Sequence, residues 1–162
     1  MPVGYRLCKP RWAPNSPDAA RLAGEGARRF GGRWNTAGVP AVYTSGSVAL
    51  AVLEVLVHAQ GELPDGLELW RVEIPIDVLE IKAPIESWLR FPYSREVQEM
   101  GDSALAGAAA VEVPSAVVPL EVNYILNPEH TEYPAEAWTL LGVFDFDYRL
   151  NPQSKLTLTH EG

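Results

Sequence analysis

Cysteine is almost absent from this chain, since Cys8 is the only one in 162 residues. No disulfide can form within the chain, which suits a reducing compartment such as the cytoplasm. The N-terminus lacks the basic-then-apolar pattern of a secretory signal peptide, and no apolar run approaches the length that spans a bilayer. We therefore expect a cytoplasmic protein that does not engage the membrane.

Basic residues and histidines are also scarce. Lys and Arg total 13 against 21 Asp and Glu, which gives a net charge of -8. Nonspecific binding to nucleic acid or anionic lipid needs a basic surface, so we expect neither partner. The three histidines, His58, His130 and His160, lack the spacing of metal ligands, so we expect no metal site. Neither a phosphate-binding Walker loop nor a Gly-x-Gly-x-x-Gly motif is present.

Hydrophobic residues are plentiful, at 47% of the chain, which predicts one domain with a substantial core. Strand-like and helical segments mix without regular alternation, and this favours an α+β fold with mixed or antiparallel strands. Residues 1–150 are expected to form the domain, and residues 151–162 a polar, frayed C-terminal tail. Strands are expected at 3–8, 40–44, 67–76, 78–81, 116–119, 124–126 and 138–146, and helices at 47–60, 85–89 and 94–110; residues 18–30 fit either a short helix or an ordered loop.

One carboxylate, Glu54, lies inside the otherwise apolar run 48–57. The predicted helix over 47–60 is apolar nearly all round and is therefore expected to be buried. A buried charge is costly unless it is paired or hydrogen-bonded, and no Lys or Arg lies three or four residues away. One interpretation is an ion pair with Arg33 or Arg6 that only fixes the fold. The other is a carboxylate held for chemistry, which we favour because perturbed carboxylates gather at functional sites.

Three further side chains are candidates for a site. Arg33 follows two glycines that let the backbone approach a ligand closely, and its guanidinium suits a phosphate or carboxylate. An equal alternative is a surface arginine, or one that packs on Trp34. Tyr43 ends a predicted strand, where it suits either stacking on a flat ring or core packing. Ser115 lies between two prolines without a Gly-x-Ser-x-Gly elbow or a histidine partner, so we reject a serine hydrolase.

Several segments, in order, resemble the RES domain family. They are the opening Tyr5 and Arg6, GGRWN followed by VYTS and ALAVLE, the block PSAVVPLEVNYILNP, and the closing FDFDYRL. The family takes its name from an Arg, a Glu and a Ser, and Arg33, Glu54 and Ser115 stand at the matching positions. The resemblance covers roughly residues 3 to 150.

The resemblance implies a fold similar to that of ADP-ribosyltransferases. It implies the toxin of a bacterial toxin–antitoxin pair, whose partner is an Xre-like antitoxin with a helix-turn-helix. The implied activity is that of an NAD phosphorylase or NAD glycohydrolase, which cleaves the nicotinamide–ribose bond. NAD is then the substrate, inorganic phosphate is a co-substrate if phosphorolysis occurs, and no cofactor is expected.

The residues suit this chemistry. Cleavage of an N-glycosidic bond passes through an oxocarbenium-like state, whose positive charge Glu54 would stabilise. Two alternative functions stay open: a protein ADP-ribosyltransferase on the same fold, and a noncatalytic module that binds the antitoxin. Whether the chain forms a homo-oligomer also stays open. Arg33, Glu54 and Tyr43 are expected to be catalytic, and Arg6, Ser115 and Asn123 to bind the substrate.

Overall fold

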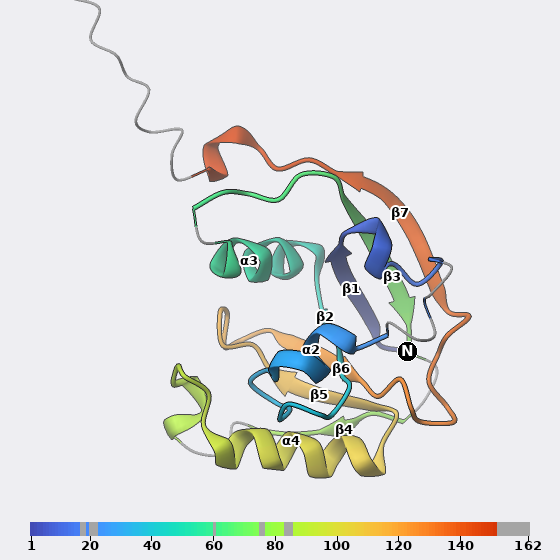
Figure 1. The fold of residues 1–162 in the computed structure, drawn as a ribbon, viewed down its shortest axis with the longest axis vertical. Helices are drawn as coiled ribbons and strands as arrows, with labels where there is room; N and C mark the ends of the chain where they lie inside the picture. The colour runs from blue at the N-terminus through green and yellow to red at the C-terminus, as the bar shows by residue number, and fades with distance from the viewer. Residues whose placement is uncertain (17–18, 20–22, 60, 75–76, 83–85, 152–162) are drawn as a thin grey trace, which may run out of the picture.

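A mixed β-sheet with helices packed against it organises the chain (Figure 1). The computed structural model describes all residues except 17–18, 20–22, 60, 75–76, 83–85 and 152–162. Within the described residues the sheet has seven strands in the order β4-β5-β6-β2-β1-β3-β7. The strands are β1 (Val3–Cys8), β2 (Val42–Ser45), β3 (Leu67–Glu73), β4 (Leu79–Glu80), β5 (Ala110–Pro114), β6 (Val122–Leu126) and β7 (Trp138–Phe144).

Neighbouring strands run antiparallel, apart from the parallel pair β4 and β5. The predicted α+β fold with mixed strands in a single domain is therefore confirmed. The helices are α2 (Glu25–Phe30), α3 (Val48–His58) and α4 (Arg95–Gly107), and short 3-10 turns lie at η1 (Pro10–Trp12), η2 (Glu86–Leu89) and η3 (Tyr148–Leu150). In the described part of the chain no helix is both long and apolar enough to cross a bilayer.

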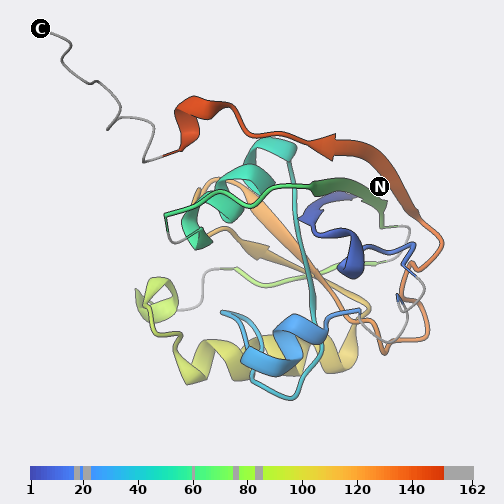
Figure 2. The ribbon, with the colours of Figure 1, turned by 45° about the horizontal axis from the view of Figure 1, so that its top comes forward.

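The middle of the sheet is where its two halves meet. β1 follows β3 along its whole length, whereas β1 and β2 pair only through Tyr5 and Ser45. α3 packs on β1 and β2 at this junction, and Figure 2 shows it in the upper half of the domain, with α2 and α4 at the opposite end. The side chains of α3 that face the strands therefore lie at the centre of the sheet.

Two hydrophobic clusters cover opposite faces of the sheet. On one face α4 packs on β5 and β6 through buried Val97, Ala104 and Leu105, and the same cluster takes in Trp34 and Trp88. The other face holds a second cluster, which takes the alternate residues Ala110 of β5 and Leu126 of β6 and adds Val42 of β2, Val72 of β3 and Ile74 just after β3. Burial on both faces fixes the strand register, because a shift by one residue would exchange the two sets.

Two predictions about secondary structure need correction. The helix expected over 94–110 ends at Gly107, and residues 110–114 form β5 instead of continuing it. The strand expected over 116–119 is a turn, because the backbone amides of Val117 and Val118 bond to the Ser115 hydroxyl and not to a neighbouring strand. The predicted tail from residue 152 onward lies outside the described residues, and residues 75–76 of the strand expected over 67–76 do so too.

α3 is also less buried than its composition suggests. Leu50 and Ala51 are buried, but the side chain of Val57 is 62% exposed and that of Leu53 is 38% exposed. Glu54 is half-buried. The expectation of a helix buried all round is therefore wrong, since only the side of α3 toward the strands is covered.

Candidate active site

The start of α3 is fixed by a capping serine. Ser47 Oγ accepts a hydrogen bond from the backbone amide of Leu50 at 3.1 Å, which satisfies one of the free N–H groups of the first turn. The same hydroxyl donates to Glu121 Oε2 at 2.8 Å. The cap thus ties α3 to the residue that precedes β6.

The Glu54 carboxylate is held through one of its two oxygens. Asn123 Nδ2 of β6 donates to Glu54 Oε1 at 2.8 Å, and Ser115 Oγ donates to the same atom at 3.3 Å. Among the described residues Oε2 receives no hydrogen bond. The carboxylate is therefore oriented by neutral donors, with one oxygen left to meet a ligand.

Ser115 is locked as a donor toward Glu54. It is fully buried, and its Oγ accepts from the backbone amides of Val117 and Val118, both at 3.1 Å. Its own backbone amide donates to Glu121 O at 2.9 Å. With both lone pairs occupied, the hydroxyl hydrogen points to the carboxylate. This makes Ser115 a positioning residue for Glu54.

Asn123 faces Glu54 with its amide nitrogen only. Its other polar atom, Oδ1, is buried and has no hydrogen-bond partner in the described structure. A buried acceptor without a partner is costly and is a common mark of a functional position. The residue lies on β6 opposite Ser45 of β2, beside the junction of the two halves of the sheet.

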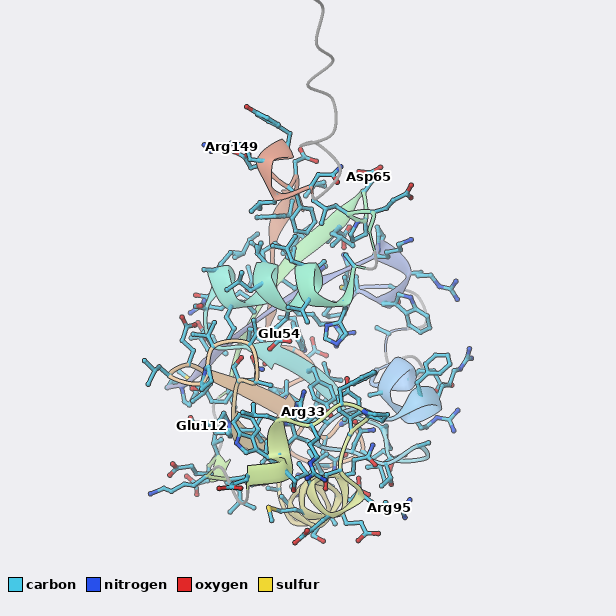
Figure 3. The ribbon with its side chains drawn as sticks, turned by 90° about the vertical axis from the view of Figure 1, so that its left-hand side faces the viewer. Arg33, Glu54, Asp65, Arg95, Glu112 and Arg149 are labelled. Carbon is cyan, nitrogen blue, oxygen red and sulfur yellow. The ribbon has the colours of Figure 1, made fainter. Side chains whose placement is uncertain are left out.

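Arg33 lies in the turn before β2 and is held by backbone carbonyls. Its Nη1 donates to Trp88 O and to Arg90 O, the latter at 3.1 Å, and its Cζ lies 5.1 Å from the ring centroid of Tyr93. Figure 3 shows Glu54 below α3 and Arg33 below it, between α3 and α4 on the same side of the molecule. Neither residue is in an ion pair among the described residues, so the structure does not bear out a fold-fixing pair between them.

The turn that carries Arg33 closes on the side chain of Asn35. Asn35 is fully buried, and its Nδ2 donates to the carbonyl oxygens of Ala27, Thr36 and Val39 at 2.9, 3.2 and 3.0 Å. Its Oδ1 accepts from Tyr43 Oη at 2.7 Å. A buried amide that is satisfied on both ends fixes the path of the chain on either side of it.

Tyr43 supports the same turn. Besides donating to Asn35, its hydroxyl accepts from the backbone amide of Trp34 at 3.1 Å. Burial raises the pKa of the Tyr43 phenol well above its ordinary value, so the hydroxyl stays neutral. A Cβ at Gly32 would lie 2.6 Å from Tyr43 Oη, so the second glycine of the motif is required by this contact. The Tyr43 hydroxyl thus positions the turn, and its role in catalysis stays a prediction.

α4 clamps the Arg33 turn from below. Gln98 Nε2 donates to Gly32 O at 2.9 Å and to Asn35 O at 3.2 Å. Asp102 accepts from the backbone amide and the hydroxyl of Thr36, at 3.0 and 2.6 Å. At Gly101 the helix backbone lies so close that a Cβ would be 1.8 Å from Trp34 O. Through these contacts α4 fixes the position of the turn that carries Arg33.

Arg6 is not brought together with the other candidates. On β1 it shares a face with Cys8 and lies opposite Trp70, whereas Tyr5 shares the face of Ser45 and therefore of Asn123. Strand alternation thus puts Arg6 on the side of the sheet away from Glu54. Its proposed role in binding the same substrate has no geometric support.

The sequence-based candidates divide accordingly. Glu54, Ser115 and Asn123 form one hydrogen-bonded group, and Arg33 and Tyr43 belong to a second group beside it. Sequence reasoning missed Asn35, Gln98 and Asp102, although Asn35 stands in the GGRWN motif itself. Across the described ranges no cluster of three or more His, Cys, Asp or Glu is arranged to hold a metal ion.

Similarity to known proteins identifies the family of this chain. A family model described as RES domain matches residues 4–148. The chain is 39% identical over 130 residues to "Toxin Res" of Photorhabdus laumondii subsp. laumondii, which covers 76% of this chain and 80% of that protein. It is 38% identical over 124 residues to the "Prs ADP-ribosylating toxin" of Sphingobium sp., covering 71% and 77%. The fold matches a chain in the crystal structure of the M. tuberculosis MbcT-MbcA toxin–antitoxin complex, with a TM-score of 0.66 and 23% identity over 96% of this chain and 90% of that chain.

Proposed function

Since the chain belongs to the RES domain family and is a toxin of that family, we propose that it depletes NAD by cleaving the nicotinamide–ribose bond. The acceptor is inorganic phosphate, which gives ADP-ribose 1″-phosphate, or water, which gives ADP-ribose. NAD is the substrate, and the proposal needs no bound cofactor. The reaction takes place in the cytoplasm, where the NAD pool lies.

The chemistry is balanced without an external oxidant or reductant. The C1″–N bond breaks, its electron pair leaves with nicotinamide, and the pyridinium becomes a neutral ring. An oxygen of phosphate or water forms the new bond to C1″, and with water one proton is released. Because the leaving group departs neutral, the site needs little acid catalysis.

The observation that carries the proposal is the one-sided hold on Glu54. Ser115 and Asn123 fix Oε1, and Oε2 is left to face the positive charge that develops on the ribose ring. A carboxylate oriented beforehand costs no reorganisation when that charge appears. Arg33, on the same side of the molecule, supplies the cation that the pyrophosphate requires.

We further propose that an antitoxin protein binds and silences the toxin. One solved structure with this fold is the M. tuberculosis MbcT-MbcA toxin–antitoxin complex, and an enzyme that destroys NAD needs such restraint in its own cell. An Xre-like helix-turn-helix partner is the type that the resemblance to the family implies.

Protein ADP-ribosylation is the second candidate, and one observation favours it: the Sphingobium relative bears the name of an ADP-ribosylating toxin. The same bond breaks in both reactions, and only the acceptor differs. A noncatalytic module that binds the antitoxin has no comparable support, because it gives no reason for a carboxylate held by one oxygen.

The test is NAD loss by the purified protein, with and without inorganic phosphate. Glu54→Gln keeps the shape of the side chain and removes its charge, so we expect at least a hundredfold loss of activity. Glu99→Gln is the matched control, because Glu99 lies on the exposed surface of α4 and, among the described residues, pairs with Arg95 alone. Intact NAD in both buffers, from folded wild-type protein, would refute NAD depletion. Label from NAD on an added protein would then support the second candidate.

A further inference from the structure

The loop that joins η2 to α4 presents an exposed aromatic ring, Phe91, which contacts the Tyr93 ring that lies against Arg33. Phe91 is 80% exposed, although large aromatic side chains are mostly covered. We propose that Phe91 is the platform on which the adenine ring of NAD stacks. This inference rests on the proposed function and assigns the part of the site that recognises the adenylate half of the substrate.

The first argument is the way Arg33 is anchored. Its Nη1 is used up by the carbonyls of Trp88 and Arg90, so the arginine is held by the loop itself. A guanidinium has further donors on Nε and Nη2, and in the described residues these have no partner. They remain for an anion such as a pyrophosphate, and any such anion binds next to this loop.

The second argument is a chain of ring contacts that leads away from the arginine. Arg33 Cζ lies 5.1 Å from the centroid of Tyr93, and the Tyr93 and Phe91 rings lie 5.4 Å apart and at 88° to each other. In this T-shaped arrangement the edge of one ring meets the face of the other, and Phe91 still stays 80% exposed. Phe91 therefore has an open face one ring away from the cation.

The third argument is the order of the groups along the substrate. In NAD the pyrophosphate joins the nicotinamide riboside to the adenosine, so the two flat rings lie on opposite sides of the anion. Arg33 lies between α3 and α4 (Figure 3), and the segment from η2 to α4 lies at the end of the domain away from α3 in Figures 1 and 2. With the nicotinamide ribose at Glu54 and the pyrophosphate at Arg33, the adenine comes to this loop.

Charge on the loop agrees with this assignment. Arg90 is exposed, and its backbone carbonyl accepts a hydrogen bond from Arg33. The loop therefore carries a second guanidinium, that of Arg90, on the residue that holds Arg33. In a chain with a net charge of -8, two neighbouring arginines whose side chains pair with no carboxylate in the described structure mark a local site for an anion. The adenine base and the pyrophosphate of NAD are thus complementary to the exposed Phe91 ring and the two arginines, Arg33 and Arg90.

The experiment measures inhibition of NAD cleavage by two half-substrates, AMP and nicotinamide mononucleotide, in the full-length protein. A base stacked on an aromatic side chain contributes about tenfold or more in affinity. For Phe91→Ala we expect the inhibition constant of AMP and the KM of NAD to rise about tenfold. The inhibition constant of nicotinamide mononucleotide is expected to stay unchanged, and Phe91→Tyr to behave as wild type.

Tyr148→Ala is the control, because Tyr148 is 76% exposed and lies on η3 at the other end of the domain. Both rings are exposed, so neither change removes core packing. An unchanged AMP constant in Phe91→Ala, an equal rise for both inhibitors, or a wild-type protein that AMP does not inhibit overturns the inference. A folded wild-type protein that leaves NAD intact refutes the proposed function instead, before any variant is compared.

Discussion

Ser115 and Glu54 are joined by a hydrogen bond of 3.3 Å from Oγ to Oε1, across 61 residues of sequence. Two backbone amides, those of Val117 and Val118, occupy the acceptor side of the serine hydroxyl and so fix the direction of the bond. Ser115, the serine at the matching position of the family motif, therefore orients the glutamate, and this role requires no nucleophilic step.

Ser115→Ala tests this role. The change leaves two buried amides without an acceptor, which should lower the free energy of unfolding by about 1–3 kcal/mol. It also removes one of the two donors that orient Glu54, so kcat should fall while KM for NAD stays close to wild type. Urea denaturation and steady-state kinetics measure the two effects. A nucleophilic serine would instead abolish all turnover, and that outcome would contradict the positioning role.

Gln98→Glu tests the clamp on the Arg33 turn. The new carboxylate would face the carbonyl oxygens of Gly32 and Asn35, where the amide now donates. We expect the turn to shift and the activity to fall by about a hundredfold, since small displacements of substrate-binding groups have effects of that size. Glu99→Gln, one residue along α4, should change little. Equal activity of the two variants would show that Gln98 does not position Arg33.

Gly101→Ala probes the close contact between α4 and Trp34. Alanine favours a helix by about 1 kcal/mol over glycine, but here its Cβ would meet Trp34 O at 1.8 Å. The clash should dominate and destabilise the protein by about 1–3 kcal/mol. Gly107→Ala in the same helix meets nothing within 4 Å and should be neutral or stabilising. Thermal melts of both variants decide it, and a stabilised Gly101→Ala would refute the contact.

Cys8 offers a test that depends on pH. Burial raises the pKa of its thiol, an effect that the nearby Arg6 guanidinium only partly opposes. The folded protein should therefore react slowly with a thiol reagent at pH 8, and the urea-unfolded chain quickly. Because the pKa is higher in the folded state, stability should decline as the pH rises above about 8.5, where the unfolded thiol ionises. Rapid modification of the native protein would contradict this, and Cys8→Ala should remove the decline.

The part of the site that could be predicted is the part with a local chemical signal. Glu54 is conspicuous because a carboxylate interrupts an apolar run, and the helix that carries it was predicted almost to its ends. The family motif then supplied Arg33 and Ser115. The hydrogen bond between Asn123 and Glu54 could not be predicted from a local pattern, because it depends on how α3 packs at the junction of the sheet.

The remaining misses have physical causes. The predicted helix runs on to Ala110, the first residue of β5, because alanines at 108–110 continue the helical pattern. The rest of β5 was not predicted as a strand, although β6 and β4 pair with it. Arg33 is held by carbonyl oxygens, which every residue has, so nothing in the sequence marks its partners. Arg6 looked like a member of the site because only the register of β1 against β2 decides which face it takes. The likeness to ADP-ribosyltransferases and the domain limits stay predictions.

The tether of Arg33 to main-chain oxygens has a consequence for how such a site can vary. These hydrogen bonds use only main-chain oxygens of residues 88 and 90, so they do not depend on which side chains stand there, provided that the path of the loop is kept. Trp88 is constrained for a separate reason, because its side chain is buried in the hydrophobic cluster with Trp34. Insertions or deletions between η2 and α4 are a different matter, because they change that trace. A designer who transfers this arginine to another protein must therefore preserve the length of the loop between η2 and α4 more than the identity of its residues.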